Sequence, residues 1–243
     1  MSFSNSILRF TTYCRRHGLR AIVSRMGEAV NRVMFVNRTV LFYFDLVDET
    51  SDQAEPPPSI VIERKRNESE ISATDLEEFM NFWNPQIARR EMQARFKTDA
   101  LLWMIKVDGK LAGYGWTLRG RTMEPHFYLL GLDDVHLFDY YVAPAYRGRG
   151  LNPLLVNQVL RQLATERLGR AFIEVAEWNR AQLSSLRKTP FHRLGCARKL
   201  TVGRQTAVWF ADGLSRSSVE HATDNSSTAA DRAKPSGVRD LNV

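Results

Sequence analysis

Strand patterns recur along the middle of the chain, between about residues 59 and 213. The clearest pair is a hairpin, because apolar runs at 101–107 and 111–118 flank an Asp-Gly turn, a dipeptide typical of tight β-turns. The predicted strands lie at 59–62, 101–107, 111–118, 135–142 and 171–178, with two more between 191 and 210. Helical patterns separate several of them, so an α/β domain is expected.

Four helices are predicted between these strands. Ser72 or Thr74 can cap the first helix, and an Asn-Pro pair at 84–85 begins the second. The third helix follows a glycine-rich turn and has leucines and valines at helical spacing between 154 and 163. The fourth helix is short and spans 180–188.

The two ends of the chain differ in composition from the middle part, which is expected to form the domain 59–213. Residues 1–46 combine a basic helical pattern with a strand-like run at 40–44, and are expected to form an N-terminal extension. Residues 47–58 are acidic and end in three prolines, which predicts an extended linker. Residues 214–243 hold six serines and no aromatic residue, so a disordered tail is expected.

The net charge of +7 favours anionic partners in general and names none of them. Much of the excess lies in 1–40, where seven arginines accompany a single acid, Glu28. The basic helix suits two roles: packing on the sheet, which the strand-like run beside it favours, or lying on an anionic membrane surface. A nucleic-acid-binding protein is disfavoured, because the arginines lie on an apolar helix rather than along a basic stripe with exposed aromatics.

The sequence predicts a cytoplasmic protein. The N-terminus lacks the charged segment and apolar block of a secretory signal, and Cys14 and Cys196 are interpreted as free thiols. No run approaches the roughly 20 apolar residues of a membrane-spanning helix, so any membrane contact is expected to be peripheral, at the inner face. No Cys/His cluster has metal-ligand spacing, so no metal is expected. Whether the chain forms a homodimer is left open.

The most informative stretch is the glycine-rich turn that links the strand at 135–142 to the third helix. Such a turn can direct several main-chain N–H groups at one anion, and the helix dipole adds positive potential. Gly148 and Gly150 let the anion approach closely. The spacing does not fit a P-loop, since no Gly-Lys-Ser/Thr follows, or a dinucleotide fingerprint, since the third glycine is missing. A pyrophosphate site is expected here; the alternative is a plain surface turn.

With this loop the chain resembles the GNAT superfamily of acyl-CoA N-acyltransferases. Arg147 and Gly150 are in register with the family motif Arg/Gln-x-x-Gly-x-Gly/Ala, and Asn179 is similar to the family's second motif. The resemblance implies a mixed, mostly antiparallel central sheet flanked by helices, and acetyl-CoA or another acyl-CoA as co-substrate. The cofactor-binding residues that it implies are Val142, Arg147, Gly148, Arg149, Gly150, Leu151, Asn152 and Asn179.

Three positions depart from the family pattern. Asn152 stands where Gly or Ala is usual and is expected to crowd the last turn of the loop. Leu186 replaces the tyrosine that protonates the departing thiolate in many members, and Pro190 replaces a glycine.

The activity that the resemblance implies is transfer of an acyl group, most often acetyl, from acyl-CoA to an amine by direct attack in a ternary complex. The amine acceptor would be a small molecule or a peptide. The alternative is a non-catalytic acyl-CoA-binding or interaction module, which the missing tyrosine supports.

The catalytic candidates are His136 and Tyr140. Strand alternation predicts that the even-numbered residues of 135–142 share one face, which by resemblance borders the thioester. His136 lies where some members keep a Glu or His base, and its ordinary pKa suits that role; the alternative is a structural histidine beside Asp133 and Asp134. Tyr140 is a candidate proton donor, the alternative being packing between helix and sheet. Ser185 is a weaker candidate acid, and Glu174 and Glu177 are interpreted as solvated carboxylates at a strand edge.

Overall fold

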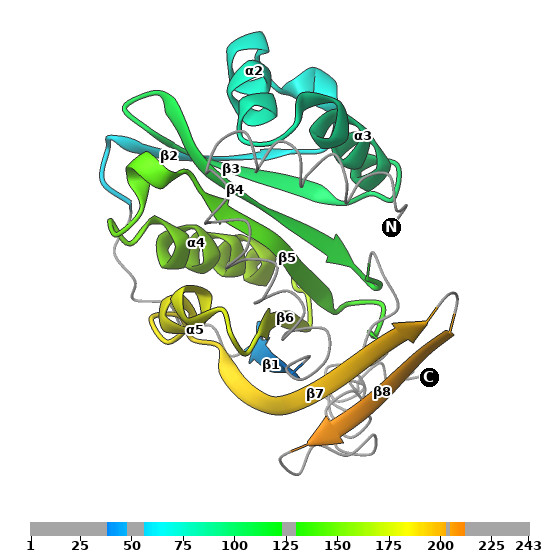
Figure 1. The fold of residues 1–243 in the computed structure, drawn as a ribbon. Coiled ribbons are helices and arrows are strands. Elements are labelled where there is room, and N and C mark those ends of the chain that lie inside the picture. The colour runs from blue at the N-terminus through cyan, green and yellow to red at the C-terminus, as the bar shows by residue number, and fades with distance from the viewer. Residues whose placement is uncertain (1–37, 48–55, 123–129, 203–204, 212–243) are drawn as a thin grey trace, which may run out of the picture.

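The computed structural model describes residues 38–47, 56–122, 130–202 and 205–211 (Figure 1). Eight strands form one sheet in the order β2-β3-β4-β5-β6-β1-β7-β8. Their bounds are β1 (Arg38–Asp45), β2 (Ile60–Lys65), β3 (Leu101–Val107), β4 (Lys110–Arg119), β5 (Val135–Val142), β6 (Arg170–Ala176), β7 (His192–Val202) and β8 (Gln205–Ala211). In the described part of the chain β5 and β6 are parallel and the other neighbours are antiparallel. The expected mixed, mostly antiparallel sheet is confirmed.

The helices between the strands are η1 (Glu68–Glu70), α2 (Ala73–Asn81), α3 (Pro85–Phe96), η2 (Pro144–Tyr146), α4 (Leu151–Thr165) and α5 (Arg180–Leu186). Ser72 caps α2, because its hydroxyl accepts a hydrogen bond from the Asp75 N–H at 3.1 Å. Asn84 caps α3 in the same way. The four helices predicted between the strands of 59–213 are confirmed.

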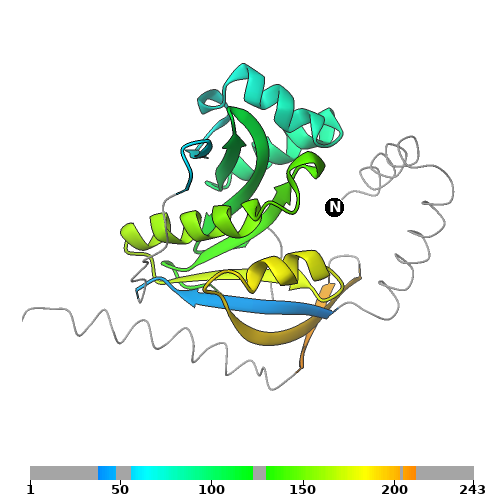
Figure 2. The ribbon, with the colours of Figure 1, turned by 90° about the vertical axis from the view of Figure 1, so that its left-hand side faces the viewer.

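Helices cover both faces of the sheet (Figures 1 and 2). On one face, here called the α4 face, leucines and valines of α4 share a buried cluster with Val135 and Leu137 of β5 and with Leu186 of α5. On the opposite face, the α2/α3 face, Phe79 and Met92 pack with Tyr114 and other residues of β3 and β4. Burial of each such side chain contributes about 1.5–3 kcal/mol, which ties both helix layers to the sheet.

Strand β1 lies inside the sheet, between β6 and β7, and is antiparallel to both. Val40, Phe42 and Phe44 belong to the cluster on the α4 face, and Leu41 faces the other side. The strand-like run predicted at 40–44 is therefore confirmed. It belongs to the same sheet as the strands of 59–213, although the chain between β1 and β2 was predicted to be a linker.

Several predicted segments lie outside the described residues. They are the basic helix within 1–37, most of the linker, at 48–55, and the tail from 214. The domain boundaries drawn from the sequence stay a prediction. Within the described ranges, no helix combines the length and the apolar character needed to span a membrane.

Candidate active site

A gap opens in the sheet where β5 and β6 diverge. These parallel strands pair over three residues only, from Val135 with Ala171 to Leu137 with Ile173. Beyond that point β5 continues beside β4, and β6 continues beside β1. Beyond this point β5 and β6 each keep one hydrogen-bonded neighbour, and the two edges that face each other separate.

A β-bulge in β5 lies beside this gap. Tyr114 pairs with Tyr141 and Trp116 pairs with Phe138, so Asp139 and Tyr140 together face the single residue Gly115. Asp139 has a positive φ of 51°, a conformation that Asp adopts more readily than most residues. The extra residue shifts the alternation of every side chain that follows.

The bulge corrects one expectation from the sequence, that the even-numbered residues of β5 share a face. Phe138 packs with the cluster on the α2/α3 face, as Tyr141 does, whereas Tyr140 and Val142 pack with the cluster on the α4 face. His136 stacks on Phe138, with ring centroids 5.3 Å apart. The two catalytic candidates, His136 and Tyr140, therefore approach the gap from opposite faces of the sheet.

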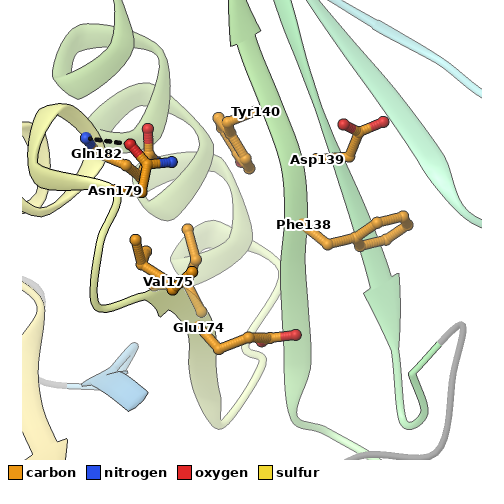
Figure 3. Close-up of a pocket in the computed structure, with 9 residues that line it drawn as sticks. Phe138, Asp139, Tyr140, Glu174, Val175, Asn179 and Gln182 are labelled. Atoms are coloured by element: carbon orange, nitrogen blue, oxygen red, sulfur yellow. Dashed lines mark hydrogen bonds between the residues drawn. The ribbon is translucent and has the colours of Figure 1, made fainter. Parts of the chain in front are cut away.

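The gap holds a pocket (Figure 3). Its lining residues come from β5, β6 and α5 and are Phe138, Asp139, Tyr140, Ile173, Glu174, Val175, Ala176, Asn179 and Gln182. Figure 3 shows Tyr140 on the side of β5 that faces α5, and Phe138 and Asp139 on the other side of the strand.

Tyr140 is positioned by the absence of a side chain on β4. A β-carbon on Gly115 would overlap the Tyr140 ring, so glycine at this position leaves the space that the ring occupies. The Tyr140 hydroxyl is buried and has no hydrogen-bond partner among the described residues. Burial raises the pKa of this phenol above its usual value, so the proton stays on the oxygen at neutral pH.

The glycine-rich turn follows β5 directly. Gly148 and Gly150 have φ angles of 78° and 74°, and a β-carbon at either would meet no atom within 4 Å. These glycines are required by the left-handed backbone and leave the main chain open to an incoming group. Gly150 caps α4 with no side-chain hydrogen bond, and the first-turn N–H groups of a helix have no intrahelical partner.

The two arginines of the turn are exposed and rest on tyrosine rings. The guanidinium of Arg147 lies 5.7 Å from the ring centroid of Tyr141, and that of Arg149 lies 5.4 Å from the ring of Tyr146. Arg147 also donates from Nε to the main-chain oxygen of Val142 at 3.1 Å. Both cations are thus held beside the N-terminus of α4.

Asn152 was expected to crowd the last turn of the loop, but its side chain faces α5 instead. Its Nδ2 donates to Gln182 Oε1 at 3.0 Å and to Ser185 Oγ at 2.8 Å. The small Ser185 leaves room for the amide. Asn179 caps α5, because its Oδ1 accepts from the N–H of Gln182 at 3.2 Å. Leu186 is only 1% exposed and belongs to the core, so this position offers no phenol to the site.

His136 and Glu174 form a pair that the sequence did not predict. The His136 Nε2 and Glu174 Oε2 atoms are 2.7 Å apart. The acids considered as neighbours of His136 have other partners: Asp133 pairs with Arg119, and Asp134 forms a bidentate pair with the buried Arg170. The interpretation of Glu174 as a carboxylate at a strand edge is wrong, because β6 is an inner strand and Glu174 lines the pocket.

No simple sequence signal predicts this pair. Alternation shows that Glu174 points to the face opposite Ile173 and Val175, but not that β6 lies in parallel beside β5. The pairing register, in which His136 faces Phe172, brings Glu174 within reach.

Comparison with known proteins assigns the chain to a protein family. Residues 69–195, a little over half of the 243-residue chain, match the Acetyltransferase (GNAT) family. The chain therefore belongs to the GNAT acetyltransferase family, whose members use acyl-CoA. No curated protein shows a significant match to the chain.

Solved structures with a similar fold include other members of this family. A GNAT acetyltransferase from Novosphingobium aromaticivorans is 17% identical, with a TM-score of 0.44 and coverage of 68% of this chain and 63% of that one. A GCN5-related N-acetyltransferase from Sphaerobacter thermophilus is 16% identical, with a TM-score of 0.48 and coverage of 72% and 54%. The chain thus spans less than two thirds of the length of either protein.

Proposed function

We propose that the protein transfers an acyl group, in the simplest case acetyl, from acyl-CoA to an amine by direct attack in a ternary complex. One observation carries the proposal: the pocket between β5 and β6 lies beside a turn whose main chain is open to an anion. A long thioester with a pyrophosphate at one end matches this arrangement of an anion site next to a cleft in the sheet.

The turn suits the pyrophosphate. The main-chain N–H groups at Gly148, Arg149, Gly150, Leu151 and Asn152 belong to the turn and to the first turn of α4, where the helix dipole favours negative charge. Hydrogen bonds to a charged phosphate contribute on the order of 1.5–3 kcal/mol each. Arg147 and Arg149 add positive charge, and neither guanidinium forms an ion pair with a carboxylate of the described residues.

The gap suits the rest of the donor. Beyond Leu137 of β5 and Ile173 of β6 the two strand edges no longer pair with each other, so an amide-containing arm could bond to main-chain groups along these edges. The thioester would then lie near Tyr140, whose hydroxyl is buried at the pocket and has no partner among the described residues.

The chemistry requires removal of protons from the acceptor. An alkyl ammonium with a pKa of about 10.4 must lose one proton before it can attack and a second as the amide forms. His136, with its partner Glu174, is our proposed proton acceptor. As the new C–N bond forms and the C–S bond breaks, one proton ends on the thiol and the other reaches solvent.

Tyr140 is the proposed hydrogen-bond donor to the departing sulfur. A thiol has a pKa of about 8.5, lower than that of Tyr140, which burial raises. The phenol therefore stabilises the thiolate by donating a hydrogen bond, and complete proton transfer can wait until the product leaves. In this proposal Tyr140 replaces the tyrosine that is absent at Leu186.

Acyl-CoA binding without catalysis is the second candidate function, favoured by the burial of Leu186 in the core. Measurement of turnover distinguishes acyl transfer from acyl-CoA binding without catalysis. Purified protein would be given acetyl-CoA and a panel of primary amines, with release of free thiol as the readout. Acyl-CoA binding would be measured as thermal stabilisation, which reaches about 2.7 kcal/mol at 100 times Kd. Stabilisation without thiol release from any amine would favour the binding module, and the absence of both would overturn the proposal.

A further inference from the structure

We propose that residues 1–37 dock on the sheet of their own chain, on the α2/α3 face of β1, β6 and β7. The contact is made by the apolar stripe of this segment, which consists of Ile22, Val23, Met26, Val30, Val33 and Met34. The inference concerns an interaction surface and does not depend on the acyl transfer proposed above.

The docking surface is an apolar patch that three neighbouring strands build together. Its buried members are Leu41, Phe172 and Ala197, and its partly buried members are Tyr43, Leu130 and Leu194. The adjacent residues Val40, Ile173 and Cys196 belong to the cluster on the α4 face. Since side chains alternate along a strand, the docking surface lies on the α2/α3 face.

The described residues do not supply a layer over the docking surface. Leu41 and Ala197 are both 0% exposed. Within the described residues the cluster takes its members from strands and one loop residue, whereas α2 and α3 cover β3 and β4 at the other end of the sheet (Figure 1). Leu41 pairs with Glu174 and Gly195, and Gly195 has no side chain that could lean over it. Because a sheet face is buried only against another element, a second layer is required here.

The apolar stripe is tethered next to the docking surface. Strand β1 begins at Arg38, and Met34, the last residue of the stripe, lies four positions earlier. Four residues span at most about 14 Å when fully extended, so the stripe must end close to the start of β1. The α4 face of β1 is occupied, because Val40 shares its cluster with residues of α4 and α5. The docking surface is therefore the side of β1 that the stripe can reach.

The dimensions of the stripe and of the docking surface agree. As a helix, residues 22–34 would be about 20 Å long and about 10 Å wide. Three strands at the usual spacing extend about 10 Å from the first to the third. Ser24, Glu28 and Asn31 fall on the side of such a helix opposite the stripe. A docked helix would thus bury its apolar side and leave its polar side in water.

The docking surface continues to the pocket between β5 and β6. Phe172 pairs with His136, and Leu41 pairs with Glu174, which lines the pocket. Tyr140 packs with the cluster on the α4 face. A segment docked on this surface therefore lies beside the pocket, on the side away from Tyr140.

Limited digestion of the full chain with trypsin tests the docking. Trypsin cleaves after arginine, and Arg25 lies within the stretch that carries the stripe. A free peptide of residues 1–37 gives the rate without protection. Because a protease cleaves the opened form of a docked segment, cleavage after Arg25 is expected to be at least about tenfold slower in the protein than in the peptide. Mass spectrometry of timed samples measures both rates.

Two variants of the segment test the contribution of the stripe. Val30→Asp places a charge in the stripe and is expected to raise the rate of cleavage after Arg25 toward that of the peptide. Asn31→Asp is the matched control, because it places the same side chain at the next position, on the opposite side of the helix. The wild-type rate is expected for this control.

Two variants of β1 test the docking surface. Leu41→Ala shortens a side chain on this surface and is expected to raise the rate after Arg25 by about tenfold. Val40→Ala shortens a buried side chain on the α4 face of the same strand and is expected to leave the rate within about threefold of wild type. If Leu41→Ala does not fold, Val30→Asp still tests the proposal, because it leaves the sheet unaltered.

Each contrary outcome points to a different occupant. Cleavage of the wild type as fast as that of the peptide would overturn the docking, as would equal acceleration by Val30→Asp and Asn31→Asp. Protection that disappears over an about hundredfold dilution would assign the docking surface to residues 1–37 of a second copy. Protection that requires phosphatidylglycerol vesicles would assign the stripe to an anionic membrane. Either of these last two results would overturn docking within one chain.

Discussion

Gly115 and Tyr140 fit together across β4 and β5, because the tyrosine ring occupies the space where a β-carbon on residue 115 would lie. The relationship joins the bulge at Asp139 to the pocket. It also makes the position of the proposed proton donor depend on a residue that has no functional group of its own.

Substitution of Gly115 by alanine is therefore expected to displace the Tyr140 ring. Overpacking of this kind costs about 1–3 kcal/mol in the free energy of unfolding, and acyl transfer should fall because the hydroxyl moves. Denaturant unfolding and turnover would be measured together. Gly169→Ala is the control, since a β-carbon there meets its nearest atoms at 3.7 Å, an ordinary contact. Equal stability of the Gly115→Ala and wild-type proteins would contradict the packing argument.

Removal of the Tyr140 hydroxyl should separate activity from stability. Tyr140→Phe deletes a buried group with no partner among the described residues, so the free energy of unfolding should stay level or rise by about 1 kcal/mol, while kcat falls by at least tenfold. The control is Tyr114→Phe, because the Tyr114 hydroxyl accepts from Trp83 Nε1 at 2.7 Å and its loss should cost about 0.5–1.5 kcal/mol. A Tyr140→Phe protein with unchanged kcat would show that another group meets the departing sulfur.

The glycines of the turn are expected to contribute to the affinity for acyl-CoA as well as to the backbone conformation. Gly150→Ala places a side chain at φ 74°, which costs about 1–2 kcal/mol, and is expected to weaken acetyl-CoA binding as well. Gly109→Ala has the same backbone requirement, at φ 77° with no atom within 4 Å, but lies at the β3–β4 turn. Calorimetric titration with acetyl-CoA should show weaker binding for Gly150→Ala only. Equal affinities in the two variants would argue against the turn as the anion site.

An ion cluster between β3 and α2 predicts a pH dependence of stability. Lys106 Nζ lies 2.7 Å from Asp75 Oδ2 and 2.9 Å from Glu63 Oε1. Burial works to raise the pKa of Asp75, but the hydrogen bonds from Lys106 and Ser72 and the Lys106 charge outweigh it and lower that pKa. Asp75 therefore stabilises the fold above its unfolded-state pKa of about 3.9, and this contribution disappears as the pH falls through the lower pKa of the folded protein.

Asp75→Asn should accordingly lower the free energy of unfolding at pH 7 by about 1–3 kcal/mol, and the difference from wild type should shrink as the pH falls below 4. Urea denaturation from pH 7 to pH 2.5 would measure it. A difference that stays constant over this range would mean that the side chain acts through packing and not through its charge.

The local features of this protein follow from short stretches of sequence. The hairpin at Asp108–Gly109, the caps Ser72 and Asn84, and the glycine-rich turn before α4 all lie where the sequence predicts them. These features depend on neighbouring residues: a turn dipeptide, a side chain that bonds the main chain three residues on, and a backbone that needs positive φ. The family resemblance rests on the same kind of local pattern.

The remaining features were decided by how the strands pair in the folded sheet. The face on which Tyr140 lies depends on a bulge that forms only where Gly115 of β4 can accept the ring. The contact between His136 and Glu174 depends on the register of two strands far apart in the chain. The place of β1 between β6 and β7 depends on pairing with two strands that lie far along the chain. Residues 38–45, 136 and 174 carry no local signal of these partners, because strand register and order are set by the packing of the whole sheet.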